Sequence, residues 1–141
     1  MRASEALTVD RIVVDAKWIT AHVRVAQGCA LRTASFPGIA ESILELLPDL
    51  VRHRCECGSA RGIVAELADT ELPHLLEHVA LELMARAGSP RSLRGETTWD
   101  FAADGRGVFR VALEYDDDLV ALAALREGTV ILNALLQECA D

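Results

Sequence analysis

Apolar and polar positions alternate in two stretches of the chain, which is the period of a strand with one buried face. Residues 18–26 place alternate aliphatic side chains on one face, and residues 107–115 repeat the pattern around Phe109 and Val111. Residues 8–14 are rich in β-branched side chains and closely precede the first of these stretches. The pattern therefore predicts a hairpin near the N-terminus and a further strand near residue 110.

Other stretches space their apolar residues three or four apart, which is the period of an amphipathic helix. Phe36-Pro37-Gly38 starts the first helix, with Ser35 as a candidate N-cap, and Pro48 interrupts it. Further helical segments are expected at residues 48–53, 62–68, 71–87 and 117–138. Asp69 and Thr70 are candidate N-caps for the third of these. In the last helix the expected core side chains are Leu119, Leu122, Leu125, Val130, Leu132 and Leu135.

The order of these elements, β-β-α-α-β-α, predicts an α+β fold. We expect a two-layer sandwich with helices on one face of a small, mostly antiparallel sheet. Residues 89–106 contain glycines, Pro90 and polar side chains, and are expected to form a loop with at most one strand. A length of 141 residues suits a single domain spanning 1–141.

Charge and composition narrow the range of partners. The net charge of −8 repels phosphate backbones and anionic membranes, so nucleic acid is not an expected partner. No apolar run was found that reaches the roughly 18 residues of a membrane span, and residues 1–20 lack a signal sequence. We therefore expect a cytoplasmic protein without a membrane partner. Its four cysteines are then reduced, and serve as core residues, metal ligands or redox groups.

The predicted helix at 71–87 carries the pattern His74-Leu75-Leu76-Glu77-His78. This H-x-x-E-H order is the inverted form of a zinc peptidase motif. Residues four apart lie on one helical face, so His74 and His78 can converge on one Zn²⁺ while Glu77 reaches a metal-bound water as general base. Glu82 is too far along the helix to join them, which favours an outer or surface role. The alternative is that both histidines are half-exposed surface residues.

A catalytic zinc site needs three protein ligands and an open position for water. Cys55 is one candidate for the third ligand, and Cys57 is an equal alternative because it points the same way in an extended segment. His53 is a weaker candidate that could instead support a ligand, and Glu114 offers a carboxylate near the end of its strand. The two cysteines could also be small buried residues.

Several segments together resemble the N-terminal domain of cyanophycin synthetase. They are FPGIAESILELLPDLVRHRCEC at 36–57, HLLEHVALELMARAG at 74–88, SLRGET at 92–97 and VFRVALEY at 108–115. The resemblance covers roughly residues 19–136. It implies a domain that binds cyanophycin, a polymer with an aspartate backbone and arginine on its side chains. In some members it implies a zinc metallopeptidase that cuts the polymer into primers.

Carried over by position, the resemblance implies that His74, His78 and Cys55 hold zinc and that Glu77 is the general base. The sequence then favours a zinc-dependent hydrolase of peptide or isopeptide bonds in cyanophycin-like substrates. Arg94 is a candidate for binding a substrate carboxylate or an oxyanion. The chain has no Walker-type loop and stops at Asp141, so we do not expect the polymerising activity.

Two other functions remain open at the level of sequence. One is a non-catalytic module that binds cyanophycin or other peptides. The other is an interaction scaffold, possible as a homo-oligomer in which the last helix packs against a copy of itself.

Overall fold

The computed structural model describes residues 5–53 and 62–139, and four antiparallel strands form its sheet. In sequence order they are β1 (Leu7–Val14), β2 (Trp18–Val25), β3 (Gly95–Trp99) and β4 (Val108–Glu114). Their order across the sheet is β1-β2-β4-β3. The predicted hairpin is confirmed, and its register shifts at a bulge between Val9 and Arg11. The strand near residue 110 is confirmed as β4, which lies in the middle of the sheet.

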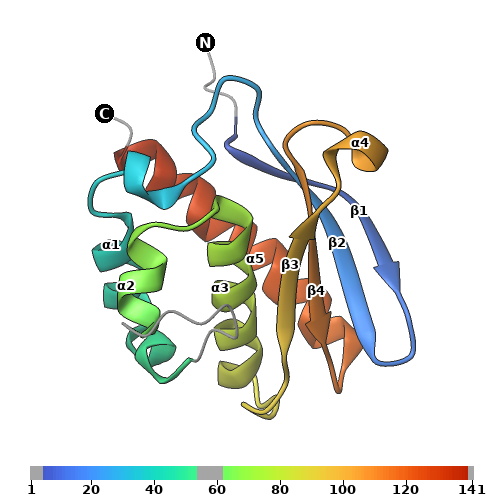
Figure 1. Cartoon of the computed structure of the whole chain (residues 1–141). Coiled ribbons are helices and arrows are strands. Elements are labelled where there is room, and N and C mark those ends of the chain that lie inside the picture. The colour runs from blue at the N-terminus through green and yellow to red at the C-terminus, as the bar shows by residue number, and fades with distance from the viewer. Residues whose placement is uncertain (1–4, 54–61, 140–141) are drawn as a thin grey trace.

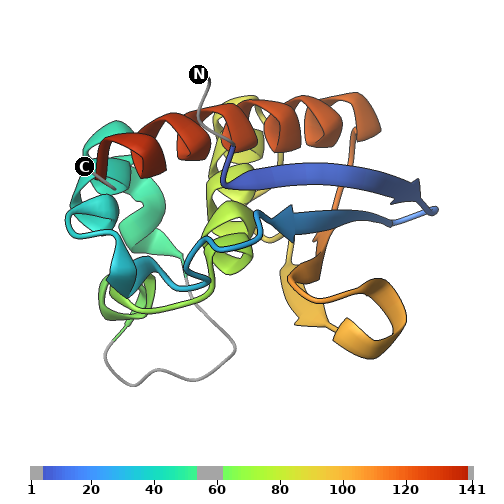
Figure 2. The ribbon, with the colours of Figure 1, turned by 90° about the horizontal axis from the view of Figure 1, so that it is seen from above.

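All but the shortest α-helix of the described part form the second layer of an α+β fold, as the element order predicted, and the shortest lies apart between β3 and β4. The α-helices are α1 (Ile39–Leu46), α2 (Ile63–Ala68), α3 (Leu72–Arg86), α4 (Phe101–Asp104) and α5 (Asp118–Cys139), with short 3₁₀ turns η1 (Thr33–Ser35) and η2 (Pro48–Arg52). Figure 1 shows α1, α2 and α3 beside the β3 edge of the sheet, with α5 behind it. Figure 2 shows α5 lying along one face of the sheet.

Three details of the predicted helices are wrong. The first helix begins at Ile39 rather than near Pro37, because Thr33–Ser35 forms a separate 3₁₀ turn and Gly38 takes a left-handed conformation (φ 87°) at the N-cap. The N-cap of α3 is Glu71, and its side chain makes no capping hydrogen bond. The short helix α4 within the expected loop was not predicted.

The predicted core of the last helix is only partly correct. Leu125 and Leu132 are buried, but Leu119 and Val130 are 71% and 64% exposed. The closest contact between α5 and α3 is made at a small residue of α5 instead. At Gly128 an added Cβ would lie 3.1 Å from Leu76 Cδ1 and 3.3 Å from Val79 Cγ1. The absence of a side chain at Gly128 therefore lets α5 cross close to α3.

The helix α5 is also long and apolar enough, by length and composition, to cross a membrane. A core helix of a soluble protein passes the same test, and here one face of α5 packs against α3. The sequence analysis expected no segment with the length and apolar composition of a membrane span, and α5 has both.

Candidate metal centre

The helix α3 is buried around most of its circumference, including its polar side chains. His74 and Glu77 are each 5% exposed, His78 is 2% exposed and Glu82 is fully buried. The interpretation of the two histidines as half-exposed surface residues is therefore wrong. Because a buried polar group must be satisfied by a partner, each of these side chains needs an identified contact.

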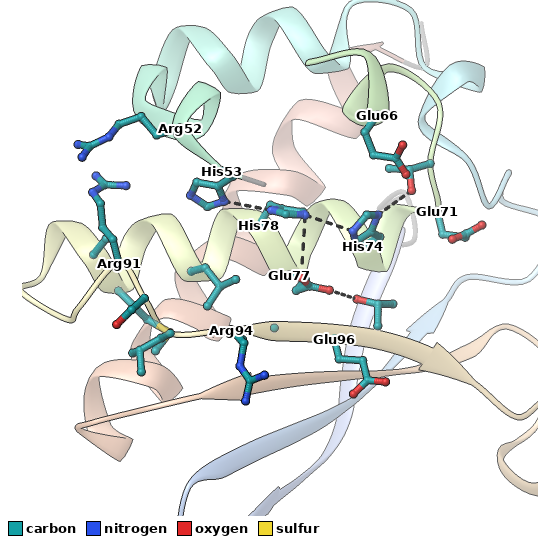
Figure 3. A pocket seen from close by; sticks show the side chains of 18 of the residues that line it. Arg52, His53, Glu66, Glu71, His74, Glu77, His78, Arg91, Arg94 and Glu96 are labelled. Carbon is teal, nitrogen blue, oxygen red and sulfur yellow. Dashed lines mark hydrogen bonds and ion pairs between the residues drawn. The ribbon is translucent and has the colours of Figure 1, made fainter. Parts of the chain in front are cut away.

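His74, Glu77 and His78 direct their donor atoms at one another inside this layer (Figure 3). The two Nε2 atoms of His74 and His78 are 3.1 Å apart. Glu77 Oε2 lies 3.9 Å from His78 Nε2, and one donor atom from each of the three residues falls within 4.8 Å of the others. The structure thus brings together the three residues that the motif predicted.

The Nδ1 atoms of both histidines face away from this group. Thr70 Oγ1 lies 2.8 Å from His74 Nδ1, and His53 Nδ1 lies 3.0 Å from His78 Nδ1. If each Nδ1 carries the proton, His74 donates to Thr70 and His78 donates to His53, which leaves both Nε2 lone pairs directed into the group. This is how partners outside a metal site fix the orientation of histidine ligands.

His53, which contacts His78, is itself hydrogen-bonded to the buried carboxylate of Glu82. His53 Nε2 lies 3.0 Å from Glu82 Oε1, and Arg91 contacts both carboxylate oxygens of Glu82, at 2.8 and 3.1 Å. Burial alone would raise the pKa of Glu82, but hydrogen bonds from Arg91 and His53 outweigh it and keep that pKa below its ordinary value. An ionised Glu82 therefore accepts the Nε2 proton of His53 and leaves His53 Nδ1 as the acceptor for His78.

Glu77 is held by strand β3. Thr97 Oγ1 donates a hydrogen bond of 2.7 Å to Glu77 Oε1, while Oε2 remains on the side of His78. The strand passes so close that a Cβ added at Gly95 would lie 2.7 Å from Glu77 Cγ. Only glycine fits at this position without moving the carboxylate, so β3 sets the place of Glu77 relative to the two imidazoles.

The imidazoles in this layer are held in the neutral form. Burial, together with the neighbouring rings of His74 and His53, lowers the pKa of His78 to about 3. Burial also lowers the pKa values of His74 and His53 below the ordinary value of the side chain. A neutral imidazole keeps the lone pair that a metal ligand needs.

A cleft of about 1070 Å³ opens over the group. Its lining includes Arg52 and Arg91 near His53, Glu66 and Glu71 near His74, and Glu96 on β3, whose side chain points away from α3 (Figure 3). Within the described residues, Arg52, Glu66 and Glu96 make no ion pair, whereas Arg91 and Glu71 are paired with Glu82 and Arg32. The cleft thus carries free charges of opposite sign on either side of the His74–Glu77–His78 group.

The structure does not add the other candidate ligands, or the candidate substrate-binding residue, to the His74–Glu77–His78 group. Cys55 and Cys57 fall outside the described residues. Glu114 accepts hydrogen bonds from Arg94, at 3.1 Å from Nε and 2.7 Å from the backbone nitrogen, and is not part of the group. Arg94 lines the cleft with a side chain that is 63% exposed. His53 uses both ring nitrogens in the contacts behind His78, which matches the supporting position rather than that of a ligand.

The sequence analysis missed Thr70, Gly95 and Thr97 as members of this site. Thr70, His74, His78 and Glu82 follow one another at intervals of four residues, so this spacing could have identified Thr70. No comparable signal marks Gly95 and Thr97, because their contact with Glu77 depends on where β3 pairs in the sheet.

The donor set fits zinc. Two imidazole nitrogens bound to one tetrahedral Zn²⁺ at about 2.0–2.1 Å would lie roughly 3.3 Å apart, close to the 3.1 Å between the two Nε2 atoms. Neutral imidazoles with a carboxylate in reach are the ligand chemistry of catalytic zinc sites. His74 and His78 can therefore hold the ion without rearrangement of α3.

Comparison with known proteins places the chain in one family. The family model described as "Cyanophycin synthase-like N-terminal domain" matches residues 20–137. The chain is 32% identical to cyanophycin synthetase of Synechocystis sp. over 72% of its own length, and 32% identical to cyanophycin synthetase of Crocosphaera subtropica over 74%. These matches cover only 11% and 13% of the two relatives. The chain therefore spans about a tenth of the curated relatives it matches.

Proposed function

Because the chain belongs to the cyanophycin synthase-like N-terminal domain family, we propose that it is a zinc-dependent hydrolase of peptide or isopeptide bonds in a cyanophycin-like polymer. The observation that carries the proposal is the buried convergence of His74, Glu77 and His78 beneath an open cleft. A merely structural histidine pair would not need a carboxylate fixed beside it at the floor of a cleft.

In this proposal His74 and His78 hold the ion through Nε2, with Cys55 as the third ligand. Bound zinc would act as a Lewis acid and lower the pKa of water at the site. Glu77 takes a proton from the attacking water through Oε2 and returns it to the leaving amine, while Thr97 keeps Oε1 fixed. The hydrogen bonds from His78 to His53 and from His53 to Glu82 hold the ring of His78 in position.

The free charges of the cleft suit a substrate that carries both signs. Glu66 can bind a guanidinium group on the His74 side, and Arg52 can bind a carboxylate on the His53 side. Aspartate and arginine are the components of the polymer named by the family. Charge complementarity of this kind orients an extended ligand across the metal centre.

The experiment separates hydrolysis from binding by comparing wild-type protein with Glu77→Gln. Purified protein is loaded with zinc, its metal content is measured by mass spectrometry, and cleavage of a synthetic polymer hexamer is followed by chromatography. We expect one zinc per chain in both proteins and a loss of turnover of about 10²-fold or more in Glu77→Gln, because an amide cannot accept the proton.

The control is His78→Ala, which should lose both zinc and turnover. Full activity in Glu77→Gln would overturn the assigned general base. Zinc-loaded wild-type protein that binds the hexamer without cleaving it would instead identify a binding module that does not hydrolyse its ligand.

A further inference from the structure

The strand β3 is an edge of the sheet that borders the candidate metal centre. It pairs with β4 on one side, and its other side faces the cleft, which Gly95, Thr97 and Trp99 all line. An unpaired strand edge presents backbone N–H and C=O groups that can pair with another extended chain.

The direction of the backbone groups follows from the register. Arg94 is paired with Glu114 on the β4 side, because its carbonyl oxygen accepts from the Glu114 nitrogen at 2.8 Å and its nitrogen donates to Glu114 Oε1. Antiparallel ladders alternate, so Glu96 and Thr98 also direct their backbone groups at β4. The backbone groups of Gly95, Thr97 and Trp99 consequently point to the open edge.

Two of these three residues, Gly95 and Thr97, lie against Glu77 of the candidate metal centre. Thr97 holds Glu77 by its hydroxyl, and Gly95 passes directly against the Glu77 side chain. The described structure gives no hydrogen bond from the backbone of Gly95, Thr97 or Trp99 to any other element. A chain paired with this edge would run about 4.8 Å from β3, on the side that faces the cleft.

We propose that the free edge of β3 binds an extended polypeptide segment through backbone hydrogen bonds and places one of its amide carbonyls beside the His74–Glu77–His78 group. The ligand class is a polypeptide main chain, because the edge offers alternating donors and acceptors to a backbone. Side-chain selectivity comes separately from the charges of the cleft. The catalytic part of this assignment, and the choice of probe below, rest on the proposed function.

Trp99 marks one end of this binding edge. Trp99 is 55% exposed, and its ring packs against those of Phe101 and Phe109, at centroid distances of 6.3 and 5.8 Å. A supported and exposed indole can stack on a guanidinium group of a bound chain. The edge thus provides backbone pairing along its length and a cation-binding surface where the strand ends.

The test uses the Glu77→Gln protein, which keeps the probe intact, and a synthetic cyanophycin hexamer. Affinity is measured by calorimetry for the unmodified hexamer and for five versions, each with one of its five backbone amides N-methylated. We expect a period-two pattern, with a loss of about tenfold where the N–H faces β3 and little change at the intervening positions. Equal affinities for all five versions would overturn the edge assignment.

Hydrogen exchange of the protein provides a second measurement. In the free protein the amides of Thr97 and Trp99 should exchange quickly and those of Glu96 and Thr98 slowly, and the hexamer should slow the first pair. A matched pair of variants, Thr97→Val and Thr97→Pro, removes the hydroxyl in both but the outward N–H only in the proline. We expect about tenfold weaker binding in Thr97→Pro than in Thr97→Val.

The outcomes distinguish this inference from the proposed function. Period-two losses and protection of Thr97 and Trp99, together with no cleavage by zinc-loaded wild-type protein, would support the edge and reject the hydrolase. Cleavage of the hexamer without a period-two pattern would support the hydrolase and reject the edge. Failure of the unmodified hexamer to bind would overturn the edge assignment together with the substrate class.

Discussion

His53 shows at the level of single residues how a side chain can support the metal centre without belonging to it. We expect His53→Ala to lower zinc affinity about 10- to 100-fold, because His78 loses the acceptor that fixes its ring. The measurement is a competition titration against a zinc chelator. His22→Ala, on a strand residue outside the cleft lining, is the matched control and should bind zinc normally. Unchanged affinity in His53→Ala would show that His78 needs no such support.

The residues of the candidate site differ in how far the sequence reveals them. His74, Glu77 and His78 are local to one helix, so their spacing alone predicts that they share a face. His53, at the C-cap of η2, and Thr97, on β3, reach the same site, and nothing local in the sequence encodes those contacts. The burial of all three helix residues was also missed, because helix periodicity does not say how many neighbouring elements cover a helix.

The crossing of α3 and α5 is the contact between elements that sets the position of the site. Gly128→Leu should destabilise the protein by roughly 1–3 kcal/mol, because the new side chain has no room beside Leu76 and Val79. Ala123→Leu adds the same side chain to an exposed position of α5 and should change stability little. Urea unfolding of both variants measures the difference. Equal stabilities would mean that the helices separate without cost.

The elements themselves were predicted well where their pattern is strong. The alternation in 18–26 and 107–115 gave β2 and β4 to within a residue or two, and the spacing in 71–87 gave α3. The errors in α5 have one physical cause. Leu119 and Val130 were expected inside because they are large and apolar, whereas the buried face is formed in part by Gly128 and other small residues that permit a close helix approach.

The candidate metal centre joins both layers of the whole molecule. Its donors lie on α3, His53 directly follows the 3₁₀ turn η2, and Thr97 and Gly95 come from the sheet. An ion bound by the native state and not by the unfolded chain stabilises the entire fold by mass action. Metal binding should therefore be visible in the unfolding transition of the domain as well as in the chemistry of one residue.

We expect zinc at 100 times its dissociation constant to stabilise the protein by about 2.7 kcal/mol, which raises Tm by roughly 8–10 °C for a chain of this size. A chelator should reverse the shift, because the ligands lose the ion while the neutral imidazoles keep their contacts with Thr70 and His53. Scanning calorimetry of wild-type and His78→Ala protein makes the comparison at equal zinc. A shift of the same size in His78→Ala would place the ion elsewhere, whereas a shift confined to the wild type would locate it between the two layers.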